Sequence, residues 1–258
     1  EALLSDRTRL VCFTLCSNIV GTVNDFQAIS KMAHDAGALV IGDGVSYAPH
    51  QVLDVCTSGL DIYLFSTYKT FGPHLGIMWI NPSALERLEP QGHYFNREIP
   101  HYNFNPAGPL HAEVAATAGI GTYIDSIYDY HFNETEPDFH TRAKSVFALF
   151  HRHETVQANR ILDAIANIKG SRIIGQPQAA EGSRAATISL AIEGMPSMEA
   201  AAKLAKKEVA VRNGDFYAVR CLEGLGFEDV EDGIIRISLV HYNTEQDVDR
   251  LVEALGEL

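Results

Sequence analysis

Four short apolar runs in the first eighty residues constrain the fold of this chain more than any other feature of its sequence. They lie at residues 9–15, 38–41, 61–65 and 75–80. Each run is apolar at consecutive positions and rich in β-branched or aromatic residues, as strands covered on both faces are. Between the first two runs, Phe26, Ile29 and Met32 recur at helical spacing, and Gly37 is predicted to end that helix. Buried strands separated by helices predict an α/β fold with a mostly parallel sheet.

The remainder of the chain predicts helices and then a compact α+β part. Residues 81–109 carry five of the ten prolines and predict a long irregular loop of the kind that is often functional. Helices are expected at residues 110–130, 139–168, 197–207 and 244–255, and strands at 186–192, 209–212 and 234–239. Ser197 is the expected cap of its helix, and Thr244 with Asp247 resembles a capping box. We therefore expect a large domain at residues 1–138, followed at 139–258 by a long connecting helix and a small C-terminal domain.

The charge and cysteine content argue against several classes of protein. The chain has 258 residues, with 20 basic and 33 acidic side chains and a formal charge of −13. This charge repels phosphate backbones and anionic lipid, so neither a nucleic-acid nor a membrane partner is expected. No apolar run approaches the roughly 20 residues of a membrane-spanning helix, and we expect no signal peptide. Four scattered cysteines favour a reduced, cytoplasmic setting over a disulfide framework or a zinc site.

Two of the predicted strands end in residues that could carry chemistry. The second run leads into Gly42-Asp43-Gly44-Val45, and the third leads into Ser66-Thr67-Tyr68-Lys69. Parallel strands end at one edge of a sheet, where α/β proteins bind ligands, so Asp43 and Lys69 are expected at the same edge. The tight turn predicted at Gly72-Pro73 would fix the direction of the lysine. On this spacing alone, an Asp at a strand end is most often a helix cap or turn former, and a Lys in a loop is usually a solvated side chain. The eleven histidines include no H-E-x-x-H motif, so no metal site is expected.

Five segments carry a resemblance to a known family. They are SNIVGTVND at 17–25, VIGDGVSYAPHQVLDV at 40–55, DIYLFSTYKTFGPHLGIMWI at 61–80, AVRNGDFYAVRCLEGLG at 210–226 and IRISLVHYNTEQDVDRLVEAL at 234–255. In this order they resemble the pyridoxal-phosphate-dependent fold-type I enzymes of aminotransferase class V, and in particular the cysteine desulfurase and selenocysteine lyase branch. The resemblance implies a partial large domain with a C-terminal small domain, pyridoxal 5′-phosphate as cofactor, a small amino-acid substrate and a homodimer.

The resemblance also implies roles for individual residues. Lys69 would hold the cofactor as a Schiff base and act as the catalytic base, and Asp43 would pair with the pyridine nitrogen. Arg236 would bind the α-carboxylate of the substrate, with Arg212 as a second cation near the entrance. Further contacts to the cofactor are implied for Val45, Asn18, Ser66, Tyr68 and His50. Each of these has a plain structural alternative: core packing for Val45, a turn residue for Asn18, and an ion pair with one of the many carboxylates for Arg236.

The chain departs from the family pattern in ways that bear on the reaction. Tyr217 stands where one class of desulfurases has the cysteine that accepts sulfur, Ser46 stands where a glutamine is common, and Gly108 lies near the position of a phosphate-binding threonine. Only sixteen residues precede the first matching segment, so we expect an N-terminally truncated chain that lacks the main phosphate loop and the ring-stacking residue. The favoured interpretation is a cysteine desulfurase-like lyase or transferase. A class V aminotransferase or amino-acid epimerase is one alternative, and a non-catalytic binding or dimerisation module or an inactive fragment is another.

Overall fold

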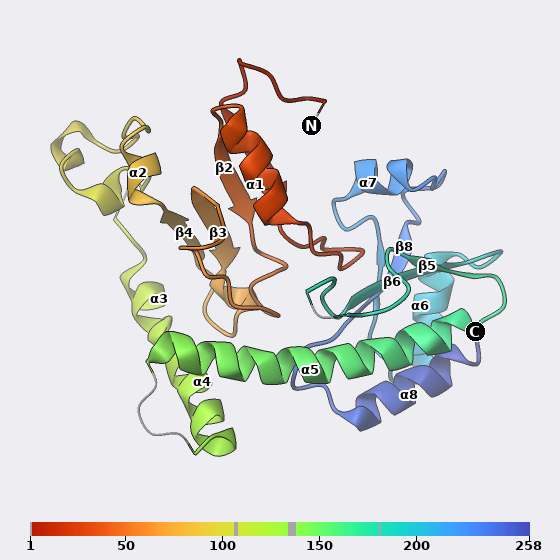
Figure 1. Ribbon diagram of the computed structural model, residues 1–258. Coiled ribbons are helices and arrows are strands. Elements are labelled where there is room, and N and C mark those ends of the chain that lie inside the picture. Colours follow the sequence, from red (N-terminus) through yellow and green to blue (C-terminus); the bar gives the residue numbers. More distant parts are fainter. Residues whose placement is uncertain (1, 106–107, 134–137, 181) are drawn as a thin grey trace. The chain divides into compact units, whose positions relative to one another are not determined.

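The computed structural model describes residues 2–105, 108–133, 138–180 and 182–258, so Pro106 of the proline-rich segment lies outside the described residues. The chain divides into two compact units (Figure 1). Unit 1 comprises Glu1–Leu15 and Asp25–Val146, and unit 2 comprises Cys16–Asn24 and Phe147–Leu258. The expected domain boundary at residues 138/139 stays a prediction.

Unit 1 is built on a mixed, mostly parallel sheet of four strands in the order β1-β2-β3-β4. The strands are β1 (Leu10–Thr14), β2 (Leu39–Asp43), β3 (Ile62–Ser66) and β4 (Gly76–Ile80). The first three are parallel and β4 is antiparallel to β3, which confirms the predicted α/β sheet. One expectation was wrong: β1 is not covered on both faces, because it is an end strand of this sheet and exposes Leu10, Cys12 and Thr14.

Helix α1 (Phe26–Asp35) begins and ends where its sequence predicts. The Asp25 side chain accepts a hydrogen bond from the amide of Ala28 and so caps the first turn. At the other end Gly37 adopts a positive φ of 77°, and the amides of Gly37 and Ala38 donate to the carbonyls of His34 and Ala33. This pair of hydrogen bonds is a Schellman motif, in which glycine carries the left-handed conformation.

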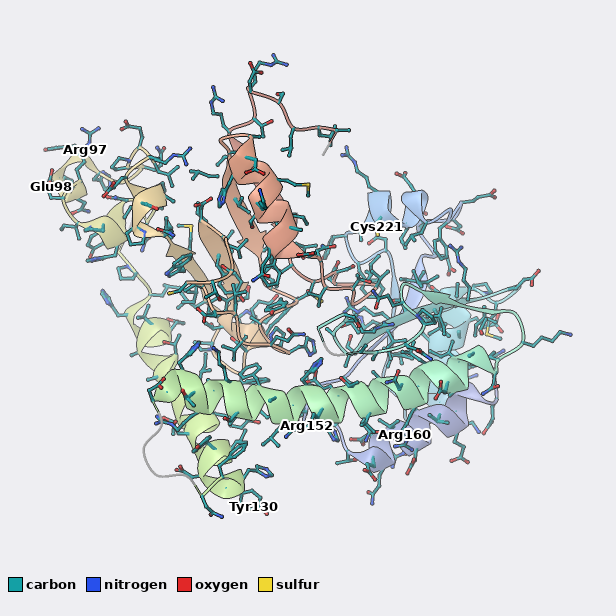
Figure 2. The ribbon with its side chains drawn as sticks, in the orientation of Figure 1. Arg97, Glu98, Tyr130, Arg152, Arg160 and Cys221 are labelled. Carbon is teal, nitrogen blue, oxygen red and sulfur yellow. The ribbon has the colours of Figure 1, made fainter. Side chains whose placement is uncertain are left out.

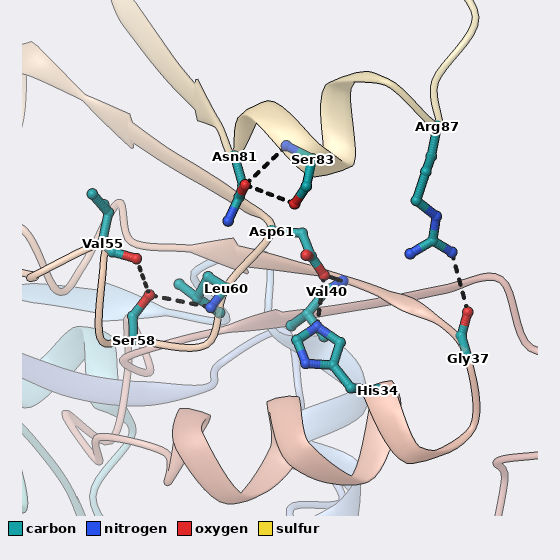
Figure 3. Close-up of polar contacts among 10 residues, drawn as sticks. All are labelled: His34, Gly37, Val40, Val55, Ser58, Leu60, Asp61, Asn81, Ser83 and Arg87. Atoms are coloured by element: carbon teal, nitrogen blue, oxygen red, sulfur yellow. Dashed lines mark hydrogen bonds and ion pairs between the residues drawn. The ribbon is translucent and has the colours of Figure 1, made fainter.

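The amino ends of β2 and β3 are tied together by side chains (Figure 3). Oδ2 of Asp61 accepts a hydrogen bond from the amide of Val40 and lies 2.8 Å from Nε2 of His34. Arg87 donates to the carbonyl of Gly37 from the segment that follows β4. These contacts hold the strands in register at the edge opposite to that reached by Asp43 and Ser66.

The chain from residue 81 to residue 131 is mainly turns and short helices. The elements are α2 (Pro82–Leu85), η2 (Tyr94–Asn96), η3 (Pro100–Tyr102), α3 (His111–Ala116) and α4 (Ala118–His131). The prediction of a single helix at 110–130 is therefore wrong. Two helices, α3 and α4, form instead, because the helical hydrogen bonding is interrupted at Thr117. The Thr117 hydroxyl donates back to the carbonyl of Val114, and the amide of Ile120 bonds three residues back to Thr117.

Unit 2 contains an antiparallel sheet in the order β5-β6-β8-β7 and the helices that cover it. The strands are β5 (Ser171–Ile174), β6 (Thr187–Ile192), β7 (Arg212–Gly214) and β8 (Ile234–Ser238). The helices are α5 (Phe139–Ala166), which begins in unit 1, α6 (Ser197–Lys206), α7 (Val219–Gly224) and α8 (Glu245–Leu255). One continuous core joins α5, α6 and α8 to the sheet through buried residues such as Ile161, Ile188, Leu204, Ile237 and Leu251.

Several boundaries in unit 2 differ from the expectation, and β5 and α7 were not predicted. The strand expected at 209–212 is present as β7, but it begins only at Arg212, because Val209 completes the end of α6. Glu208 has a φ of 60°, and the amide of Val209 donates to the carbonyl of Leu204. The Thr244–Asp247 capping box of α8 is confirmed.

The cap of α6 was also predicted wrongly. Pro196, not Ser197, occupies the N-cap position, and the first turn of α6 is capped from far along the chain. The Asp232 carboxylate accepts hydrogen bonds of 3.0 and 2.8 Å from the amide of Ser197. A carboxylate at this position also suits the positive end of the helix dipole.

Candidate functional site

The carboxyl ends of β2 and β3 lie at the same edge of the sheet of unit 1. Asp43 is the last residue of β2 and pairs in register with Leu64 of the parallel strand β3. Ser66 ends β3, and Lys69 ends the short 3₁₀ helix η1 (Thr67–Lys69) that follows at once. The predicted meeting of the Asp43 and Lys69 segments at one sheet edge is therefore a property of the topology.

The turn that carries Lys69 is fixed by its neighbours. Thr67 is buried, its amide and hydroxyl both donate to the carbonyl of Leu75, and its own carbonyl accepts from the amides of Thr70 and Gly72. Phe71 has a φ of 68°, and a Cβ placed on Gly72 would lie 2.7 Å from a side-chain carbon of Ile120. This packing restricts the direction in which the half-buried Lys69 side chain leaves the backbone.

Asp43 lies beside an aromatic ring that sequence reasoning missed. Oδ1 of Asp43 accepts a 2.9 Å hydrogen bond from the amide of Val45. Tyr63 of β3 is only 6% exposed, and a Cβ on Gly44 would come within 2.2 Å of its ring, so this position requires glycine. Burial is the main cause that raises the pKa of Tyr63 above its usual value, followed by the nearby Tyr47 and Asp43. The phenol of Tyr63 therefore stays neutral next to the carboxylate.

The other predicted residues of this edge have their own packing. His50 is 6% exposed and ends the series of turns that follows β2. Tyr68 is 47% exposed, and its ring stacks on His74 with a centroid distance of 4.8 Å. Ser66 and Val45 are half-buried. These contacts place the side chains around the edge, and their roles toward a ligand stay predictions.

Arg212 and Arg236 form a cationic pair in unit 2. The two residues are direct partners in the antiparallel pairing of β7 with β8, so their side chains share one face of the sheet. Neither forms an ion pair with a carboxylate within the described ranges of the chain. Burial, and then the charge of Arg212, lowers the pKa of Arg236. Nε of Arg236 is buried and has no hydrogen-bond partner among the described residues.

Asn18 lies in unit 2 with Arg236, and not in the same unit as Asp43 and Lys69. Its carbonyl accepts a 2.9 Å hydrogen bond from Nη1 of Arg236, and its side-chain amide donates to the carbonyl of Phe216 at 3.0 Å. Phe216 in turn places its ring 4.0 Å from the guanidinium carbon of Arg236. Sequence reasoning missed Phe216, because nothing local signals a contact with a strand some twenty residues further on.

Tyr217, at the position where one class of desulfurases has the sulfur-accepting cysteine, and the nearby Cys221 are both exposed residues of unit 2. Tyr217 is fully exposed at a φ of 61°, and Cys221 is exposed on α7 (Figure 2). Within the described residues, no three His, Cys, Asp or Glu side chains are grouped so that they could hold a metal ion. No helix in the described part of the chain has both the length and the apolar character needed to cross a membrane.

Comparisons with known proteins show which family this chain resembles. Residues 1–251 match the family model described as Aminotransferase class-V. The chain is 33% identical to the aminotransferase-like protein FGM3 of Gibberella zeae, over 99% of this chain and 60% of that protein. It is 30% identical to a probable cysteine desulfurase of Halalkalibacterium halodurans, over 99% of this chain and 59% of that protein. The chain thus spans about 60% of the length of the curated relatives it matches.

Solved structures show the same fold. The cysteine desulfurase CsdA of Escherichia coli superposes with a TM-score of 0.79 at 24% identity, over 99% of this chain and 60% of that one. A cysteine desulfurase of Thermococcus onnurineus superposes with a TM-score of 0.77 at 21% identity, over 96% and 59%. These likenesses confirm the predicted fold type I architecture.

Proposed function

Because this chain belongs to the aminotransferase class-V family, we propose that it is part of a pyridoxal-phosphate-dependent enzyme of the cysteine desulfurase type that acts on an amino acid. The observation that carries the proposal is that the segments of Asp43 and Lys69 lie at the same carboxyl edge of one parallel strand pair. Relatives named as cysteine desulfurases support this branch of the family over an aminotransferase, an epimerase or a non-catalytic module.

The residues present fit the cofactor of this family. Asp43 has one described hydrogen bond, at Oδ1, and a carboxylate can accept several, so it has capacity left for a protonated ring nitrogen. Gly44 leaves no side chain beside it, and Lys69 is half-buried, as an amine that must lose its proton needs to be. When bound, pyridoxal phosphate supplies an electron sink for the carbanion that forms at the substrate α-carbon.

Lys69 and Asp43 would each act on a different proton. The Nζ of Lys69 would attach the cofactor and then, as a free amine, accept the α-proton of the substrate. Asp43 would keep its negative charge and hold a proton on the ring nitrogen by a charge-assisted hydrogen bond. The neutral Tyr63 beside it adds no second negative charge that would compete for that proton.

Binding of substrate and cofactor would involve the remaining predicted residues. Arg236 would hold the α-carboxylate through its planar fork, with Arg212 adding positive charge on the same face of the sheet. Contacts with the ring or phosphate of the cofactor are proposed for Val45, Asn18, Ser66, Tyr68 and His50.

The proposal extends to the whole protein in three respects. We expect a cytoplasmic location, which is supported by four cysteines that are all free thiols. We expect a homodimer, which is supported by exposed apolar side chains at Tyr94, Phe95, Leu110 and Val114 of unit 1. The charge of −13 argues against nucleic-acid and membrane partners.

The test is to locate the cofactor on the protein. The complete protein is incubated with pyridoxal phosphate, reduced with borohydride and digested, and mass spectrometry is expected to find the cofactor on the peptide that contains Lys69. Lys69→Ala should lose both this adduct and sulfide release from cysteine, whereas Lys31→Ala, at an exposed ion pair on α1, should keep both. An adduct on another lysine, or amino-group exchange with a keto acid in place of sulfide release, would contradict the proposal.

A further inference from the structure

The strongest unexplained feature outside the proposed chemistry is the way in which the side chain of Arg236 is held. A free arginine side chain samples many rotamers, and ordering it to bind a carboxylate costs conformational entropy. In unit 2 this ordering has been achieved without an acidic partner in the described residues. The guanidinium contacts instead a carbonyl oxygen and an aromatic face.

Three contacts form a closed cycle around the guanidinium. Nη1 of Arg236 donates to the carbonyl of Asn18, the side-chain amide of Asn18 donates to the carbonyl of Phe216, and the ring of Phe216 lies 4.0 Å from the guanidinium carbon. Asn18 lies about two hundred residues before the other two in sequence, so no local constraint explains the arrangement. The cycle restricts both the plane and the position of the guanidinium.

Phe216 makes this contact from an unfavourable backbone conformation. Its φ of 53° lies in the left-handed region, which residues other than glycine, asparagine and aspartate seldom adopt. The following Tyr217 is also left-handed, and its amide donates to the side chain of Asp215 at 2.8 Å, which holds the turn. Local strain that the surrounding contacts maintain is typical of residues that serve a site.

The chemistry of the contact suits carboxylate recognition. A stacked ring attracts the cation through its π face and accepts no in-plane hydrogen bond, so it uses none of the five N–H donors of arginine. Only Nη1 has an acceptor among the described contacts, and the buried Nε has none. An acidic partner in place of Phe216 would occupy these donors and cancel the charge.

We propose that Phe216 is a positioning residue that, together with Asn18, holds the guanidinium of Arg236 in place for the carboxylate of the substrate. This inference rests on the proposed function, in which Arg236 binds that carboxylate. Tyr217, its neighbour in the same turn, is fully exposed and provides a matched control.

The test measures how strongly the complete holoenzyme prefers cysteine to cysteinamide, as the ratio of the two kcat/KM values. Phe216→Leu should lower this ratio by about tenfold, as expected for loss of a cation–π contact at a partly buried site. Phe216→Trp should keep it, and so should Tyr217→Ala. A general loss of folded or cofactor-bound enzyme would lower both kcat/KM values equally and leave the ratio unchanged. Phe216→Met, which keeps the apolar volume without the ring, repeats the test if the leucine variant does not fold.

The outcomes separate the inference from the proposed function. If Arg236→Gln abolishes the preference for the acid but the leucine and methionine variants keep it, the role of Phe216 is overturned and that of Arg236 stands. If Arg236→Gln leaves the wild-type preference unchanged, both are overturned. A fall in the ratio in the non-aromatic variants alone supports the inference.

Discussion

Arg212 and Arg236 face each other across two strands, although the chain carries 33 acidic residues that could pair with them. Two like charges directly opposite in a sheet destabilise it, and burial adds to the cost for Arg236. At the other predicted site the charged group is the carboxylate of Asp43, and the phenol of Tyr63 beside it stays neutral. The two arginines have no carboxylate partner in the described residues, which is how a site for a charged ligand differs from a structural ion pair.

The raised pKa of Tyr63 predicts a loss of stability at alkaline pH. An unfolded tyrosine ionises near pH 10, whereas the buried Tyr63 keeps its proton, so above that pH the folded state binds more protons than the unfolded state. The contribution is present below the unfolded pKa and is lost as the pH rises, by up to about 1.4 kcal/mol per pH unit.

Urea unfolding of the chain at pH 9 and at pH 11 measures this effect. Tyr63→Phe should reduce the loss of unfolding free energy between the two pH values. Tyr130→Phe, at a residue of α4 that is 84% exposed (Figure 2), should leave the loss unchanged. Equal losses in the Tyr63 variant and the wild type would contradict the assignment.

Among the elements, α6 depends on a residue outside its own sequence. The helix begins after Pro196, whose side chain offers no acceptor, and the Asp232 carboxylate takes that role for the amide of Ser197. Helix α8 is capped by its own Thr244 and Asp247. The two helices pack into one core, so the cap of α6 also links the loop before β8 to that core.

Removal of the distant cap should therefore cost stability in unit 2. Asp232→Ala should lower the free energy of unfolding by about 1–2 kcal/mol, because it leaves a helix N-terminal amide without its acceptor. Glu231→Ala, an exposed neighbour with no described contact, should change it by less than about 0.5 kcal/mol. Urea titrations of the three proteins make the comparison, and equal midpoints would show that the cap contributes nothing.

For the whole molecule, the exposed apolar side chains of unit 1 bear on the proposed homodimer. Tyr94 is 84% exposed, Phe95 65%, Leu110 59% and Val114 46%, all within one stretch of the chain. Aromatic side chains are enriched in subunit interfaces.

The proposed homodimer should therefore be sensitive to charge at this stretch. Leu110→Asp with Val114→Asp should convert a dimer to a monomer at micromolar concentration, because burial of two unpaired carboxylates is costly. Light scattering coupled to gel filtration gives the mass directly. Tyr242→Asp, at a side chain 66% exposed in unit 2, should leave the mass unchanged. A wild-type protein that is monomeric would rule out the dimer.

The sequence by itself determined the features that depend on neighbouring residues. Consecutive apolar runs predicted the strands of unit 1, and Gly37 and Thr244 marked helix ends. The rule that parallel strands end at one edge predicted the segments of Asp43 and Lys69 at that edge. Only the tertiary structure placed Tyr63 beside Asp43, Asp232 at the start of α6 and Phe216 on Arg236. A turn, a cap or a strand is stabilised within a few residues and leaves a local pattern. A contact between distant residues depends on the path of the chain. It also depends here on a left-handed backbone conformation, which a phenylalanine in the sequence does not predict.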